Sequence, residues 1–235
     1  FGYANKAMRG SDCGFGGDVP LGAGMSSSAA LESGLACALN DLFNHNISRM
    51  ELTKMAQKAE HEYAGVQCGI MDQFAVMHGR KNMVMKLDCR SLEYHYYPLK
   101  MDEYMLVLVN TGVKHSLAES AYNVRKQECE EGVGILKRYD DRINSLRDVS
   151  IDLIMARKND FSENVYKRCT YVIEENLRLE NACCALEGKD YVAFGQYMFG
   201  SHAGLRDKYE VSCAELDQLV EIARNCEGVL GARMM

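Results

Sequence analysis

The stretch that decides the fold reads Gly16-Gly17-Asp18-Val19-Pro20-Leu21-Gly22-Ala23-Gly24-Met25-Ser26-Ser27-Ser28-Ala29-Ala30-Leu31. Glycines flank Ala23, three serines follow, and leucines then recur at helical spacing. We therefore expect a Gly-rich loop that enters an amphipathic helix at the serines. Such a loop exposes backbone N–H groups beside the positive end of a helix, and its glycines let an anion approach closely. The stretch predicts a phosphate-binding site whose serine hydroxyls are available to phosphate oxygens or to Mg²⁺.

Two common phosphate-binding motifs do not describe this loop. No Lys-Ser/Thr follows its second glycine, as a Walker A motif requires, and Ser27 stands where the dinucleotide fingerprint has its third glycine. An ordinary loop capped by serine is the alternative interpretation. The string from Pro20 to Ala30, however, closely resembles the second signature, P-x-G-x-G-L-S-S-S-A, of the GHMP small-molecule kinases. Met25 replaces the usual leucine, which is a change that conserves volume.

Length and composition set wide limits on the class of protein. The 235 residues suffice for a substantial core in one large domain or two small ones. The formal net charge of −6 argues against a nucleic-acid surface, and the longest apolar run, Met105 to Val109, is too short to span a membrane. Ten irregularly spaced cysteines without a C-x-x-C pair are typical of free thiols in a reducing compartment. We expect a cytoplasmic monomer that binds neither nucleic acid nor membrane.

Local patterns predict a mixed first half and a helix-rich second half. Helical spacing and capping residues predict helices over 27–43, from Ser48 to Gly65, over 116–139, 150–157, 162–187 and 190–207, and from Ser212. Strands are expected over 83–87, 94–97 and 104–110. Glu60 falls on or beside the buried stripe of the second helix, where a carboxylate needs a partner. These patterns indicate two closely packed lobes with a boundary near residues 98–110.

Further segments narrow the resemblance to the galactokinase branch of the GHMP kinases. Cys68-Gly-Ile-Met-Asp72-Gln-Phe74 resembles the segment that carries the catalytic aspartate of that family, and residues 87–93 resemble the strand and turn that follow it. Residues 110–131 and 201–217 also resemble segments of the galactokinases. The resemblance implies an α+β, two-lobed GHMP kinase fold. Its N-terminal ATP-binding lobe, residues 1–103, would carry a left-handed β-α-β unit, an exception to the usual handedness, and residues 104–235 would form a helix-rich C-terminal lobe.

The activity that the resemblance implies is transfer of the γ-phosphoryl group of ATP, with Mg²⁺, to the anomeric hydroxyl of α-D-galactose. Asp72 would be the catalytic base, although without the resemblance a capping or loop aspartate is the better interpretation. Mg²⁺ would be held by Ser28 and Glu60, for which a partly exposed helical glutamate is the alternative. The sugar would be bound by Gly69, Asp72 and Tyr122, the last of which is otherwise a core or interface tyrosine. The ATP phosphates would be bound by Gly22, Ala23, Gly24, Met25, Ser26, Ser27 and Ser28.

Two alternatives to a galactokinase stay open. One is a related kinase for N-acetylgalactosamine or arabinose, and the other is a non-catalytic regulator that senses galactose and ATP. The undamaged serine motif and the presence of Asp72 favour a catalyst over a sensor. The first family signature would lie upstream of residue 1, and the glycine-rich third signature would follow Met235. We therefore expect these 235 residues to be a truncated or stitched part of a longer protein.

Overall fold

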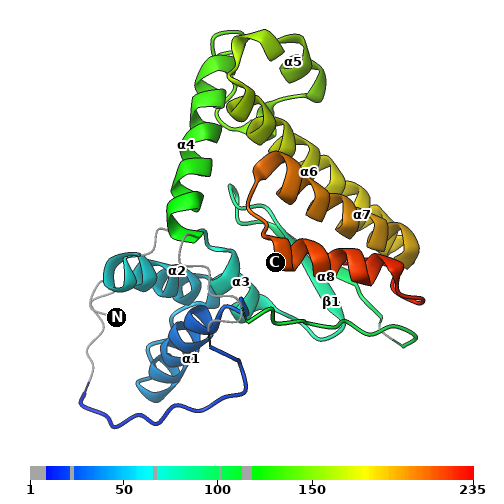
Figure 1. The fold of residues 1–235 in the computed structure, drawn as a ribbon. Coiled ribbons are helices and arrows are strands. Elements are labelled where there is room, and N and C mark those ends of the chain that lie inside the picture. Colours follow the sequence, from blue (N-terminus) through cyan, green and yellow to red (C-terminus); the bar gives the residue numbers. More distant parts are fainter. Residues whose placement is uncertain (1–8, 22–23, 66–67, 101, 113–117) are drawn as a thin grey trace. The chain divides into compact units, whose positions relative to one another are not determined.

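The computed structural model describes residues 9–21, 24–65, 68–100, 102–112 and 118–235, without the side chains of residues 118–122. The chain divides into two compact units, Phe1–Asn110 and Thr111–Met235. Each unit has its own core, and together they contain α-helices and a small antiparallel sheet, so the fold is α+β (Figure 1).

In the first unit, three helices pack against one another and a strand pair follows them (Figure 1). Buried side chains from each of the three helices, Ala36, Leu52 and Met77, form a common cluster. The elements are α1 (Ser27–Leu42), α2 (Arg49–Ala59), the π-helical turn η2 (Glu60–Ala64), α3 (Met71–His78), β1 (Met83–Leu87) and β2 (Tyr94–Pro98).

Local sequence signals account for most of these boundaries. The hydroxyl of Ser48 accepts a hydrogen bond from the backbone of Glu51, whose carboxylate accepts one in return from the Ser48 backbone, so the predicted capping box is confirmed. Gly65, at φ 73°, ends η2 in the left-handed conformation that glycine adopts without strain. The predicted hairpin is confirmed too, with Met83 opposite Pro98 in an antiparallel register.

One strand prediction is wrong. Residues 104–110 form no strand, and their side chains are exposed, as in Met105 at 84% and Val107 at 66%. Within the described ranges β1 and β2 are the only strands, and they pair with each other. An apolar run acquires strand structure only when another strand supplies hydrogen bonds, and none lies beside this run in the described chain. The β-α-β crossover implied by the resemblance is likewise not among the described elements.

The second unit is built of helices, as predicted. Its long helix α6 packs against both α4 and α7 (Figure 1). The elements are α4 (Ala118–Leu136), η3 (Leu146–Asp148), α5 (Ile151–Ala156), η4 (Lys158–Asp160), α6 (Glu163–Glu187), α7 (Tyr191–Gly204), η5 (Leu205–Tyr209) and α8 (Ala214–Asn225). The core between these helices consists of Leu136, Ile143, Leu146, Val149, Ile154, Val165, Cys169 and Ile173.

The predicted helix caps of the second unit have different outcomes. Ser150 caps α5 by accepting a hydrogen bond from the backbone of Leu153, as expected. Ser212 does not cap α8, because Cys213 is the N-cap residue and the Ser212 hydroxyl instead lies 2.6 Å from Asp217 Oδ1, to which it donates. The predicted cap at Ser116 lies outside the described residues.

Cysteines of both units are free thiols. A search of the described helices found none that combines the length and apolarity needed to cross a membrane.

Candidate active site

The loop before α1 turns sharply into a helix end that no side chain caps. Gly24 has φ 72° and Ser26, the N-cap residue, has φ 52° and ψ 43°, which is a left-handed conformation that costs a non-glycine residue energy. The Ser26 hydroxyl makes no capping hydrogen bond, and the first turn contains no acidic residue. The first turn of α1 therefore supplies neither a side-chain cap nor a carboxylate of its own, which leaves its backbone N–H groups available to an anionic ligand.

Ser28 and Glu60 lie side by side although 32 positions separate them in the sequence. The exposed Ser28 hydroxyl donates a 2.9 Å hydrogen bond to Glu60 Oε1. Glu60 is only 9% exposed, at the junction of α2 and η2, so its carboxylate has the partner that burial demands. The packing of α1 against α2 thus unites the two residues that the sequence suggested as metal ligands.

The geometry of this pair fits Mg²⁺. Mg²⁺ takes hard oxygen ligands at about 2.0–2.1 Å in an octahedron, so two adjacent ligands lie about 2.9 Å apart. The hydroxyl and carboxylate oxygens of Ser28 and Glu60 are 2.9 Å apart. No group of three or more histidine, cysteine or acidic residues is placed to hold a metal within the described part of the chain. Two protein oxygens are enough for Mg²⁺ when phosphates and water complete the shell.

Two residues that the sequence analysis missed lie against Glu60. Gln73 is fully buried and donates through Nε2 to Glu60 Oε2 at 2.5 Å. Glu32 is half-buried on α1, and burial, followed by the charge of Glu60, raises its pKa, whereas a hydrogen bond from Gln73 lowers it. Both had a signal in the sequence. Glu32 follows Ser28 by four positions, hence on the same helix face, and Gln73 is the neighbour of Asp72.

The segment that carries Gly69 and Asp72 is held in place by α2 and η2. The carbonyl of Cys68 accepts hydrogen bonds from Gln57 Nε2 at 3.2 Å and from His61 Nε2 at 2.8 Å. Gly69 is exposed, and a Cβ at this position would meet nothing within 4 Å, so its backbone is open to a ligand. Asp72 is half-buried in the first turn of α3, where the helix dipole favours a carboxylate.

Part of the predicted site lies outside the described residues. Gly22 and Ala23 belong to this part, and so does the side chain of Tyr122, whose backbone is in α4. Of the other predicted phosphate-binding residues, Gly24 and Met25 are exposed and Ser26 and Ser27 are half-buried.

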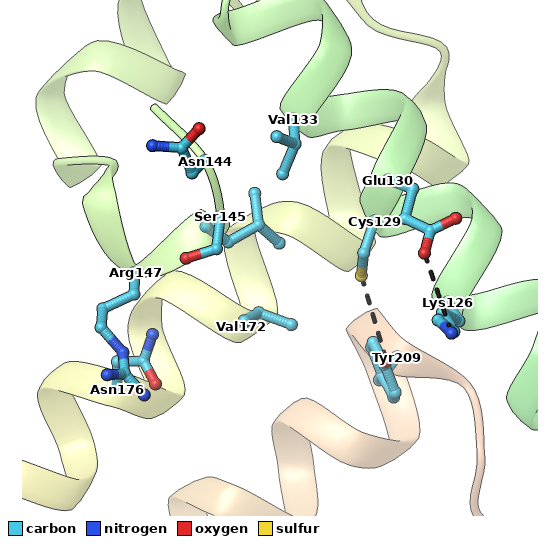
Figure 2. A pocket seen from close by; sticks show the side chains of 11 residues that line it. Lys126, Cys129, Glu130, Val133, Asn144, Ser145, Arg147, Val172, Asn176 and Tyr209 are labelled. Carbon is cyan, nitrogen blue, oxygen red and sulfur yellow. Dashed lines mark hydrogen bonds and ion pairs between the residues drawn. The ribbon is translucent and has the colours of Figure 1, made fainter. Parts of the chain in front are cut away.

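A pocket of about 490 Å³ opens in the second unit, and none of the residues that line it is a predicted site residue (Figure 2). The Cys129 thiol and the Tyr209 hydroxyl lie 4.0 Å apart on one wall, and Lys126 pairs with Glu130 at 4.0 Å on the rim. The other lining residues are Val133, Asn144, Ser145, Leu146, Arg147, Val172 and Asn176.

Comparisons with known proteins extend over most of the chain. Residues 3–80 match the family model described as "GHMP kinases N terminal domain". Over 218 residues the chain is 44% identical to the galactokinase of Thermotoga maritima, covering 93% of this chain and 60% of that protein. The galactokinase of Clostridium beijerinckii is 43% identical over 221 residues, which cover 94% of this chain and 57% of that protein.

A solved structure shares the fold. The galactokinase of Lactococcus lactis, crystallised in complex with galactose, matches with a TM-score of 0.87 and 39% sequence identity, over 93% of this chain and 56% of that one. The chain therefore spans only about 60% of the length of the curated relatives that it matches. The family model, the relatives and the shared fold agree: residues 3–80 match the N-terminal domain of the GHMP kinases, and most of the chain is similar to galactokinases.

Proposed function

We propose that the protein is a galactokinase, which transfers the γ-phosphoryl group of ATP to the anomeric hydroxyl of α-D-galactose and releases ADP. The observation that carries the nucleotide half of the proposal is the 2.9 Å contact of Ser28 with Glu60 beside the uncapped start of α1. The sugar half rests on the similarity to galactokinases, one of which was crystallised with galactose.

The N-terminal end of α1 is suited to bind the phosphates of ATP. Phosphoryl transfer asks a protein mainly to position two reactants and to neutralise negative charge. The loop of residues 22–28 would supply backbone N–H groups, and the Ser28 hydroxyl and the Glu60 carboxylate would hold Mg²⁺. When bound, Mg²⁺ neutralises charge on the transferring phosphoryl group. To act as a ligand, the Ser28 hydroxyl would give up its hydrogen bond to Glu60 Oε1 and offer its oxygen to the ion.

Asp72 would accept the proton of the sugar hydroxyl. In this step the sugar oxygen forms a bond to the γ-phosphorus, and the bond from the γ-phosphorus to the bridging oxygen breaks. ADP leaves with the electron pair of the broken bond, and the hydroxyl proton passes to the Asp72 carboxylate. The backbone at Gly69 and the side chain of Tyr122 would orient the sugar. Residues 1–103 and 104–235 would be the N-terminal and C-terminal lobes of this enzyme.

The test is an ADP-release assay on the full-length protein with galactose or N-acetylgalactosamine as the acceptor. We expect turnover with galactose and none with N-acetylgalactosamine. The Asp72→Asn variant removes the base at constant size, so kcat should fall by ~10²–10⁴-fold without loss of folding. Galactose binding without ADP release by the wild-type protein would refute the proposal in favour of a sensor. Near-normal kcat in Asp72→Asn would remove Asp72 from its role.

A further inference from the structure

Glu60 is held at both of its carboxylate oxygens by different helices. Oε1 accepts from Ser28 Oγ on α1 at 2.9 Å, and Oε2 accepts from Gln73 Nε2 on α3 at 2.5 Å. The Cys68 thiol adds a weaker contact to Oε2 at 3.6 Å. Only the Oε1 side faces the exposed hydroxyl at the start of α1, so the Gln73 side is the buried anchor of the carboxylate.

A second carboxyl group, that of Glu32, lies near this anchor. Glu32 is half-buried, its Oε2 atom is buried without a hydrogen-bond partner, and it is close enough to Glu60 to be affected by its charge. Gln73 is near enough to Glu32 to lower the pKa of its carboxyl group, against the effect of burial. The Gln73 amide thus donates to Glu60 and lies near Glu32, and its own Oε1 atom is buried without a hydrogen-bond partner.

The chemistry of an amide suits this place better than the alternatives. A side-chain amide has two N–H donors and no charge, so it can bind two carboxyl groups without competing with a cation for them. A lysine or arginine here would pair with Glu60 and weaken its hold on a cation, and an apolar residue would leave Glu60 Oε2 buried and unpaired. Two carboxylates with no donor between them would repel each other, and Glu60 would lose its fixed orientation.

We propose that Gln73 is a positioning residue that fixes Glu60 for a divalent cation. This inference rests on the proposed function, because it takes Glu60 as a ligand of Mg²⁺. It also means that α3 serves both halves of the reaction through adjacent residues. Asp72 faces the sugar, and Gln73 orients the metal ligand.

The test compares Gln73→Met with a matched control, Gln57→Met, in the full-length protein. Both changes replace an amide on the same network with an apolar side chain of similar length. The side chain of Gln57, however, donates to the Cys68 carbonyl, and the described hydrogen bonds of the Glu60 carboxylate do not include it. Loss of a residue that orients a metal ligand typically weakens metal affinity by about 10–100-fold. We expect a rise of that size in the Mg²⁺ concentration for half-maximal ADP release in Gln73→Met, with the KM for galactose unchanged.

A binding measurement separates this inference from the proposed function. Mn²⁺ binding, followed by electron paramagnetic resonance with a non-hydrolysable ATP analogue, should weaken by the same factor in Gln73→Met and stay unchanged in Gln57→Met. If Gln73→Met does not fold, Gln73→Asn replaces it, since its amide is one methylene too short to reach Glu60.

The outcomes are distinct. Wild-type turnover together with unchanged Mn²⁺ affinity in the Gln73 variants would overturn the inference and leave the proposed function standing. Weakened Mn²⁺ binding in a protein that never phosphorylates galactose would support the inference and refute the proposed function.

Discussion

Replacing Arg168 with methionine should destabilise the second unit strongly, because Arg168 is a buried cation at the meeting point of α4, α6 and η5. Its side chain is 1% exposed. Its guanidinium group donates to Glu128 Oε2 at 3.2 Å, to Glu210 Oε2 at 2.7 Å and to the carbonyl of Lys208. Methionine matches the length of the arginine stem but supplies none of these donors.

The magnitude follows from what the lost guanidinium group leaves behind. Removing one partner of a fully buried ion pair costs ~3–5 kcal/mol. Here Glu128, with a side chain that is 16% exposed, keeps a second partner in Arg125 at 2.9 Å. Glu210 is 45% exposed and regains water. The Lys208 carbonyl loses its donor. Because both glutamates are compensated, the expected loss in the free energy of unfolding lies at the lower end of the range, about 3 kcal/mol.

The matched control is Arg142→Met. Arg142 has ion-pair geometry as good as that of Arg168, with distances of 2.9 and 2.8 Å to the two carboxylate oxygens of Asp140, but its side chain is 86% exposed. An exposed pair contributes little, so we expect no measurable change in stability from Arg142→Met. The comparison therefore isolates burial from geometry.

Thermal unfolding followed by far-UV circular dichroism provides the measurement, since the chain has no tryptophan. At roughly 2–4 °C per kcal/mol for a chain of this size, Arg168→Met should lower the unfolding midpoint of the chain by about 6–12 °C. Urea unfolding gives an independent estimate of the free energy. Equal midpoints for Arg168→Met and Arg142→Met would refute the reasoning, and a rise in Arg168→Met would show that apolar packing at this site outweighs the ion pair.

Two further predictions concern α7. Gly195→Ala should lower the free energy of unfolding by ~1–3 kcal/mol, because the new Cβ would meet the carbonyl group of Leu230. Faster proteolysis near residue 230 would report the displaced segment. An unchanged cleavage rate would contradict the prediction. His202 is buried, its Nδ1 accepts a hydrogen bond from the Met234 backbone, and its Nε2 faces Asp217. Burial lowers the pKa of His202 more than Asp217 raises it, and the charges of Arg206 and Arg224 lower it further. Its neutral form therefore stabilises the fold fully above about pH 6.5, and this contribution is lost as the pH falls below that value. Between pH 7.5 and 5.5 the melting temperature should fall less in His202→Asn than in the wild type, and parallel pH profiles would exclude His202 as a source of the acid sensitivity.

Local chemistry in the sequence was enough to predict much of the fold. The capping box at Ser48, the glycine end at Gly65 and the hairpin of residues 83–98 all depend on neighbouring residues, and all three are confirmed. The loop before α1 also resembles a signature of the GHMP kinases, and the comparisons support that resemblance. Prediction failed at residues 104–110, since hydrophobicity shows that a segment can enter a sheet but not whether a partner strand is present.

The candidate site, like the fold, could be predicted from the sequence only in part. The sequence by itself predicted the loop and the helix that follows it, and the resemblance of its segments to a known family added the candidate residues Ser28, Glu60 and Asp72. Only the tertiary structure decided that Ser28 and Gln73 hold opposite oxygens of Glu60 and that Glu32 lies beside them. The physical reason is that these contacts join α1, η2 and α3, which share no local sequence pattern. They meet because α1, α2 and α3 bury a common apolar cluster and η2 continues α2.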